Sequence, residues 1–170
     1  MQQGPRFVRL LDHFCAGLDA VMERLAVTAL VGMIVATSMQ IIFRVFFRAL
    51  PWTEEVSRFL LVWATFLGAT LAYRRGMHIA VTFVVDAVPL RLRRAVRVAA
   101  LLIALAFFIL LLQTTVNYIS LQSRQLSAAL RLPMRWVYMV MPISLAVMGL
   151  HCLNQLVQLL FGRPAAVGEG

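Results

Sequence analysis

Two adjacent carboxylates and an arginine stand at the beginning of a long apolar segment. In LPWTEEVSRFLLVW, Glu54 and Glu55 precede Arg58 by four and three residues, which is the spacing of neighbours on one face of an α-helix. Carboxylates at a membrane edge can carry a proton or bind a cation. They can equally pair with an arginine and stabilise the first turn of a helix. The choice depends on the elements that position these side chains.

The composition indicates that lipid solvates most of the chain. Of the 170 residues, 62% are hydrophobic, and the mean hydropathy is +0.86, which is too apolar for a water-soluble domain of this length. The net charge of +9 comes from sixteen basic residues, all arginine, and seven acids. Because the arginines lie between apolar segments, they are typical of topology signals and not of a nucleic-acid-binding surface. The sequence therefore predicts an integral membrane protein with no nucleic-acid partner.

Four segments are long and apolar enough to cross a bilayer as helices. A spanning helix needs about 20 mostly apolar residues, and a helix satisfies its own backbone in lipid. We predict an all-α integral membrane protein with one four-helix transmembrane domain over residues 1–162 and a short flexible tail at 163–170. The spans are expected near residues 25–43, 54–73, 96–118 and 136–160, with a kink at Pro142 in the last.

Two further segments are expected at the membrane surface. Apolar residues recur at three- and four-residue intervals from Phe7 to Leu25, and acids such as Asp12 and Asp19 occupy other faces. This pattern predicts an N-terminal amphipathic interfacial helix, whose polar face is either solvated or covered by a partner. Residues 74–97 contain a glycine, a proline and six arginines, and they predict an interfacial turn between the second and third spans.

The distribution of arginines predicts which side each loop occupies. Four spans place both termini on one side of the membrane. The N-terminal segment, the central connection and the tail together hold ten arginines, against five in the first and third connections. The excess favours cytoplasmic termini. Trp52, Trp136 and Tyr138 are then expected at the outer interface, where amphipathic rings are favoured.

The second span is electrostatically consistent as a helix by itself. Thr53 is expected to cap its beginning, and Glu54 and Glu55 lie in the first turn, where the helix dipole favours anions. Arg74 and Arg75 are expected to close the last turn, where cations are favoured. A stabilised helix end is therefore a sufficient explanation for the two carboxylates, without any chemistry.

The residues needed for catalysis or ion transport are missing from the pattern. The two cysteines lie far apart, and His151 is the one histidine inside a span, so no redox pair or pair of haem ligands is indicated. His151 is expected to be a packed or hydrogen-bonded residue. The first, third and fourth predicted spans contain no acid that would carry a proton. We therefore expect a chain without cofactor, metal or enzymatic activity. A small independent exporter and a membrane-anchor subunit of a respiratory enzyme remain alternatives.

One stretch resembles a known family. In IIFRVFFRALPWTEEVSRFLLVWATFLGATLAYRRGMHIAV, residues 41–81, an arginine ends the first span and is followed by Pro-Trp-x-Glu-Glu-x-x-Arg and later by Arg-Arg-Gly-x-His. These motifs are similar to those of the small membrane subunit, the DctQ-like family, of tripartite ATP-independent periplasmic (TRAP) transporters. An acid often follows soon after the family's His-Ile pair, whereas Asp86 comes later in this chain.

The resemblance implies a noncatalytic subunit in the bacterial inner membrane. In such a transporter a periplasmic substrate-binding protein delivers an organic acid to a large permease subunit, which imports it with a sodium gradient. The small subunit is expected to bind and stabilise the large one and to help dock the substrate-binding protein. By this division of labour, the substrate is specified elsewhere.

The resemblance also suggests which residues meet partners. We expect the large subunit to contact an ion-pair and hydrogen-bond cluster around the second span, together with residues at its two ends: Arg44, Trp52, Glu54, Glu55, Arg58, Arg74, Arg75 and His78. Membrane lipid headgroups are an equal alternative for the three last residues. Docking of the substrate-binding protein is expected at the basic outer connections, through Arg48, Arg124, Arg131 and Arg135, unless these are ordinary loop charges.

Overall fold

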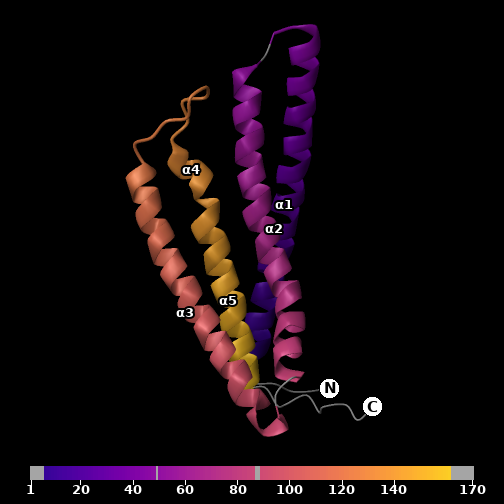
Figure 1. The fold of residues 1–170 in the computed structure, drawn as a ribbon, viewed down its shortest axis with the longest axis vertical. Coiled ribbons are helices and arrows are strands. Elements are labelled where there is room, and N and C mark those ends of the chain that lie inside the picture. Colours follow the sequence, from indigo (N-terminus) through magenta and orange to yellow (C-terminus); the bar gives the residue numbers. More distant parts are fainter. Residues whose placement is uncertain (1–5, 49, 87–88, 162–170) are drawn as a thin grey trace.

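A bundle of long helices forms the molecule (Figure 1). The computed structural model describes residues 6–48, 50–86 and 89–161, and the predicted tail at 163–170 lies outside them. The helices are α1 (Arg6–Phe46), α2 (Pro51–Asp86), α3 (Leu90–Gln122), α4 (Met134–Tyr138) and α5 (Val140–Phe161). Four stretches are long and apolar enough to span a membrane, and they confirm the predicted all-α class: Leu10–Phe46, Pro51–Gly76, Leu92–Gln122 and Met134–Leu160.

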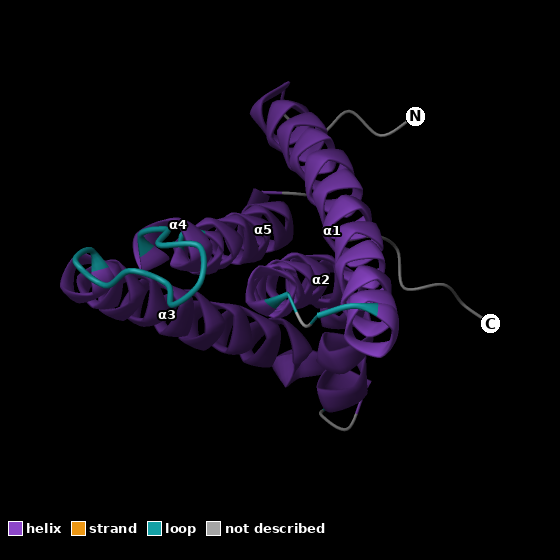
Figure 2. Cartoon of the chain, turned by 90° about the horizontal axis from the view of Figure 1, so that it is seen from above, coloured by secondary structure: helices purple, strands orange, loops and turns teal. Residues whose placement is uncertain are grey.

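The helices pack as two pairs that meet at α2 and α5. Helix α1 runs along α2, α3 runs along α5, and α2 contacts α5 between them (Figure 2). Because α5 contacts every other helix, its span is the most buried of the four. The α1–α2–α5 core is built on Met22, Leu67, Val140 and Val147, and the α3–α5 core on Leu101, Phe108, Cys152 and Leu156.

The N-terminal amphipathic segment is not a separate interfacial helix, and this corrects the sequence-based expectation. It continues into the first span as the single helix α1. No proline interrupts the segment, and Gly17 alone costs a helix only about 1 kcal/mol. The side chains of Cys15, Asp19 and Met22 are buried in the bundle. The periodic pattern correctly predicted a helix, and one face of that helix packs against α2 and α5 while Leu10, Phe14 and Val21 stay exposed.

Helix α2 begins earlier and ends later than the sequence predicted. Pro51 is its first residue, a position where the missing N–H of proline has no consequence. Thr53 is therefore inside the helix and does not cap it, and its hydroxyl donates to the carbonyl of Leu50 at 2.7 Å. The helix does not turn at residue 74 but runs to Asp86, because the next proline is Pro89. Arg74 thus lies mid-helix and not in the last turn.

The fourth span is broken as predicted, although the break precedes the proline by three residues. Helix α4 ends at Tyr138 and α5 begins at Val140. Pro142 has no N–H to donate to the carbonyl four residues earlier, and its ring clashes with that carbonyl. The indole N–H of Trp63 on α2 donates to the carbonyl of Val137 at 3.1 Å, beside the break. This bond ties the interrupted span to α2.

The bundle has two ends, which differ in how they are connected. At one, called here the loop end, α1 turns into α2 and residues 123–133 link α3 to α4. At the other, called here the terminal end, lie the beginnings of α1 and α3 and the ends of α2 and α5 (Figure 1). Each end carries its own group of polar side chains.

Candidate functional site

At the loop end, the two adjacent carboxylates have different partners. Glu54 forms an ion pair with Arg58, one turn later on the same face of α2. Both side chains are largely exposed, 51% for Glu54 and 73% for Arg58. Such a pair in contact with solvent contributes little, typically below about 1 kcal/mol. The predicted sharing of Arg58 between both acids is not what the structure shows.

Glu55 instead accepts hydrogen bonds from a distant loop. Its Oε1 accepts from the N–H of Ala128 at 2.8 Å, and its Oε2 accepts from the N–H groups of Ala129 at 3.1 Å and Leu130 at 2.8 Å. Successive backbone N–H groups that converge in a turn form a ready-made site for an anion. We call Glu55, Ala128, Ala129 and Leu130 the Glu55 cluster. It joins the beginning of α2 to the α3–α4 loop.

At the terminal end, a buried carboxylate joins three helices. Asp19 on α1 is 6% exposed and forms an ion pair with Arg74 on α2. Its Oδ1 also lies 2.8 Å from Nε2 of His151 on α5, which is 3% exposed. We call Asp19, Arg74 and His151 the Asp19 cluster. His151 is thus the packed residue that the sequence predicted, but nothing in the sequence identified Asp19 as its neighbour.

A second acid on α1 extends this contact towards the beginning of the helix. The side-chain amide of Asn154 on α5 donates to Oδ1 of Asp12 at 2.8 Å, and Gln158 donates to the same oxygen. On the α2 side, Arg75 lies 3.7 Å from Glu23, and both side chains are exposed. Asp12 and Asp19 are therefore paired with other helices of the same chain, whereas Glu23 stays exposed. Helical periodicity could have placed Asp12 and Asp19 on one face, but it could not identify that face as buried.

The position of Asp19 argues against a proton-carrying site in the bilayer core. Asp19 lies nine residues before residue 28, the middle of the Leu10–Phe46 stretch, which is about 13 Å of helix. Proton carriers in transporters are acids deep within a span. The described residues include no group of three or more His, Cys, Asp or Glu side chains that could hold a metal ion.

The other predicted partner residues are exposed on the surface, except His78, whose side chain is outside the described residues. Arg44, Arg48 and Trp52 are exposed around the α1–α2 connection. Arg124, Arg131 and Arg135 are exposed around the α3–α4 connection, and Arg135 lies over the ring of Trp136 at 5.4 Å from its centroid. Thus the five arginines at the two loop-end connections remain exposed to a partner. His78 lies in a part of α2 whose side chains are outside the described residues.

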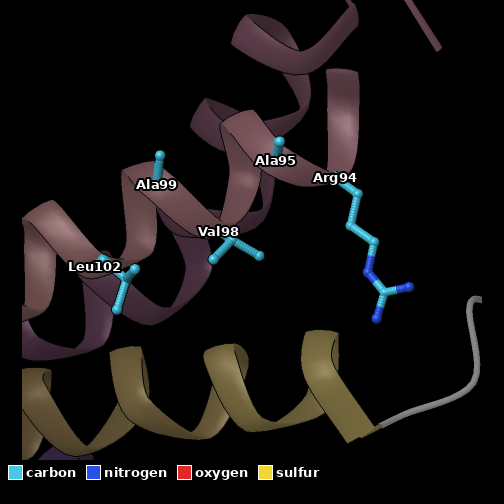
Figure 3. Close-up of a pocket in the computed structure, with 5 residues that line it drawn as sticks. All are labelled: Arg94, Ala95, Val98, Ala99 and Leu102. Carbon is cyan, nitrogen blue, oxygen red and sulfur yellow. The ribbon is translucent and has the colours of Figure 1, made fainter. Parts of the chain in front are cut away.

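A pocket at the terminal end does not look like a substrate site. Its lining residues are Arg94, Ala95, Val98, Ala99 and Leu102, all on α3 (Figure 3). The guanidinium of Arg94 points towards the end of α5, where it donates to the carbonyls of Leu159 at 3.2 Å and Leu160 at 3.5 Å. A cation near a helix C-terminus satisfies carbonyls that have no partner in their own helix. The one charged group of the pocket therefore already has a structural role.

The four long apolar helices define a multi-pass membrane protein. Its two charged clusters connect elements of the same chain. Residues 33–162 match the family described as "Tripartite ATP-independent periplasmic transporters, DctQ component". The chain belongs to this family, which confirms the resemblance of residues 41–81. It is a transporter component of the bacterial inner membrane and not an enzyme.

Individual relatives carry the same description. The chain is 34% identical over 83 residues, 48% of its length, to a small permease protein of a TRAP transporter from Haemophilus influenzae. It is 32% identical over 59% of its length to the C4-dicarboxylate TRAP transporter small permease protein DctQ of Vibrio cholerae. It is 30% identical over 64% of its length to the isethionate TRAP transporter permease protein DctMQ of Oleidesulfovibrio alaskensis. The matches span 50%, 44% and 17% of these relatives.

Proposed function

We propose that this chain is the noncatalytic small subunit of a TRAP transporter that imports an organic acid with a sodium gradient. In this role it binds and stabilises a large permease subunit in the membrane. The observation that carries the proposal is the pairing of charged side chains within the chain. Asp19, Arg74 and His151 are engaged with one another and Glu55 with a loop, so the polar groups fix the helices of a scaffold.

Long apolar faces on α1 and α3 support a role beside another membrane protein. Lipid or a neighbouring subunit has to cover these side chains. They include Val27, Val31, Ile34 and Val35 on α1 and Ile103, Phe107 and Leu110 on α3, each about half exposed or more. Because the charged residues contact one another within the chain, these apolar faces are the surfaces that a large subunit would cover.

Partner contacts are proposed for the residues that the structure leaves accessible. Arg44 in the last turn of α1 and Trp52 in the first turn of α2 are both exposed. We assign both to the contact with the large subunit. Arg75 and His78 keep the same assignment, with lipid headgroups as the alternative. Glu54, Glu55, Arg58 and Arg74 act indirectly, because their charged groups bind partners within the chain.

Sidedness is part of the same proposal. With both termini in the cytoplasm, the loop end faces the periplasm and its exposed arginines meet the substrate-binding protein. The excess of arginine in the N-terminal segment, the central connection and the tail supports this orientation. A C-terminal reporter that folds only in the cytoplasm should be active, and an inactive fusion would reverse the assignment.

Co-purification and uptake test the proposal together. A tagged chain, coexpressed with the large permease, should retain it through purification. Proteoliposomes should take up solute only when both subunits, the substrate-binding protein and a sodium gradient are present. Arg44→Gln combined with Trp52→Ala should reduce retention, while Arg24→Gln, a matched charge change near the middle of α1, should not.

Two outcomes would contradict the proposal. Transport by the purified chain alone would favour the independent exporter. A haem absorbance band in the purified chain would favour the respiratory anchor. Retention that is unchanged by the Arg44 and Trp52 substitutions would remove these residues from the interface.

A further inference from the structure

The α3–α4 loop has a defined hairpin shape. The N–H of Ser127 donates to the carbonyl of Leu132 at 2.9 Å, and the N–H of Met134 donates to that of Gln125 at 2.9 Å. Leu126 and Pro133 form an antiparallel bridge between these bonds. Residues 128–131 are thus the tip of a short hairpin, and four-residue tips of this kind are common.

The tip carries backbone strain that is retained in the folded chain. Arg131 has a φ of 55°, the one positive φ among the described non-glycine residues. In the left-handed region a residue with a Cβ costs of order 1 kcal/mol, and glycine or asparagine is the usual occupant. Such strain persists where surrounding contacts determine the conformation, often at binding surfaces. Here the guanidinium of an exposed arginine stands at that position.

Glu55 supplies the contact that determines the tip. It reaches from α2 to three consecutive N–H groups, those of Ala128, Ala129 and Leu130, directly before Arg131. Among the described residues, the hairpin itself supplies no acceptor for these three N–H groups, so without the carboxylate they would face solvent. The loop is thereby fixed to the α2 helix and not only to its own strands.

The same contact occupies Glu55 and leaves the arginines of the α3–α4 loop without a carboxylate partner in the described part of the chain. Of the two carboxylates at this end among the described residues, Glu54 is paired with Arg58 and Glu55 is bound by backbone N–H groups. Arg124, Arg131 and Arg135 are left as exposed charges without a carboxylate partner in the described part of the chain. A basic surface of fixed shape is complementary to an acidic face of a soluble protein.

We propose that Glu55 is a positioning residue, which holds the 128–131 tip in the conformation that presents Arg131 and Arg124 to an acidic face of the substrate-binding protein. This inference rests on the proposed function, because it deepens the docking role. A protein partner is favoured over lipid headgroups because a fluid lipid surface does not require a strained, fixed backbone. Glu55 itself does not touch the partner.

The first measurement concerns the loop alone. In Glu55→Gln the amide has one acceptor oxygen for three donors, so hydrogen exchange at Ala128, Ala129 and Leu130 should accelerate by about tenfold or more. Glu54→Gln is the matched control, since it removes the neighbouring charge and should leave exchange unchanged. Both are measured by mass spectrometry on the purified complex of small and large subunits. Unchanged exchange in Glu55→Gln would overturn the positioning role.

The second measurement concerns docking. Uptake by proteoliposomes is followed against the concentration of the substrate-binding protein. Glu55→Gln should raise the half-saturating concentration on the order of tenfold, as expected when steering charges are displaced, while uptake at saturation stays near that of the unmodified complex. Arg131→Asn, which tolerates the left-handed backbone but lacks the charge, should raise it similarly without accelerating exchange at 128–130.

The outcomes separate this inference from the proposed function. If the unmodified complex assembles and transports but Glu55→Gln and Arg131→Asn leave the half-saturating concentration unchanged, the docking role fails and the proposed function stands. If the unmodified complex neither assembles nor transports, the proposed function fails first. If Arg131→Asn changes uptake only in vesicles containing phosphatidylglycerol and not in phosphatidylethanolamine alone, the surface binds lipid, and the inference is overturned.

Discussion

The two carboxylate clusters use the same kind of group in opposite surroundings. The Asp19 cluster is buried and joins α1, α2 and α5 through two cationic or ionisable side chains. The Glu55 cluster lies at the edge of the bundle and joins α2 to a loop through backbone N–H groups. A buried charge that loses its partner is strongly destabilising, whereas a charge at the solvent edge can be rehydrated.

Because of this difference, we expect the Asp19 cluster to stabilise the bundle and the Glu55 cluster to determine the conformation of the α3–α4 loop. Three helices converge on Asp19, so its loss affects how the bundle is packed. Glu55 holds a segment that already has its own hairpin bonds, so its loss affects how that segment is presented. A third contact, between the indole of Trp63 and the carbonyl of Val137, is partly buried, so its burial is intermediate between those of the two clusters. The substitutions below test whether the effects rank in this way.

The largest effect is expected from Asp19→Asn. This nearly isosteric change leaves Arg74 without a counter-charge and should lower the free energy of unfolding by about 3 kcal/mol. For a chain of this length that corresponds to a fall in Tm of about 6 °C or more. Thermal unfolding of the purified protein in detergent measures it. Glu23→Gln, an exposed acid on the same helix, is the control, and an equal Tm in the two variants would refute the ranking.

A double substitution measures the coupling between Asp19 and Arg74. Arg74→Gln should also destabilise, because it leaves Asp19 buried without its cation. Combining it with Asp19→Asn should cost less than the two losses added together, since neither charge is then left unpaired, with a coupling of about 1 kcal/mol or more. The Tm values of the four proteins measure this coupling. Strict additivity would show that the two side chains act separately.

An intermediate effect is expected from Trp63→Phe. The ring volume in the α1–α2–α5 core is largely kept, but the N–H donor to the carbonyl of Val137 is lost beside the α4–α5 break. A lost hydrogen bond of this kind costs about 1 kcal/mol, and Tm should fall by a few degrees. Trp136→Phe, an exposed indole on α4, is the control. A loss as large as that of Asp19→Asn would show that the break and not the buried charge limits stability.

The smallest global effect is expected at the loop end. Arg58→Gln removes one partner of an exposed pair and should change the free energy of unfolding by less than about 0.5 kcal/mol. Its Tm should be within error of the unmodified protein. Glu55→Gln should also leave Tm close to that value while its loop exchanges faster, which is the signature of local opening. A Tm loss in Glu55→Gln that matches Asp19→Asn would remove the distinction between the clusters.

The sequence predicted the elements more reliably than their contacts. Hydropathy and helical period gave four spans, the break near Pro142 and the role of His151 as a packed residue, because these depend on local composition and spacing. The same rules placed a turn at residue 74 and a cap at Thr53, since arginine and threonine are common at helix ends. Tertiary packing of the continuing helices overrode these local preferences.

By itself, the sequence determined the solvent, the number of spans and the family, because apolar length and short motifs are properties of consecutive residues. The tertiary structure alone decided what each charge does. Glu54 and Glu55 are adjacent in sequence, yet one faces Arg58 and the other faces residues 128–130. Asp19 and His151 are far apart in sequence, yet they meet where α1 crosses α5. Charges act over a few ångströms in space, and only the packing of helices sets those distances.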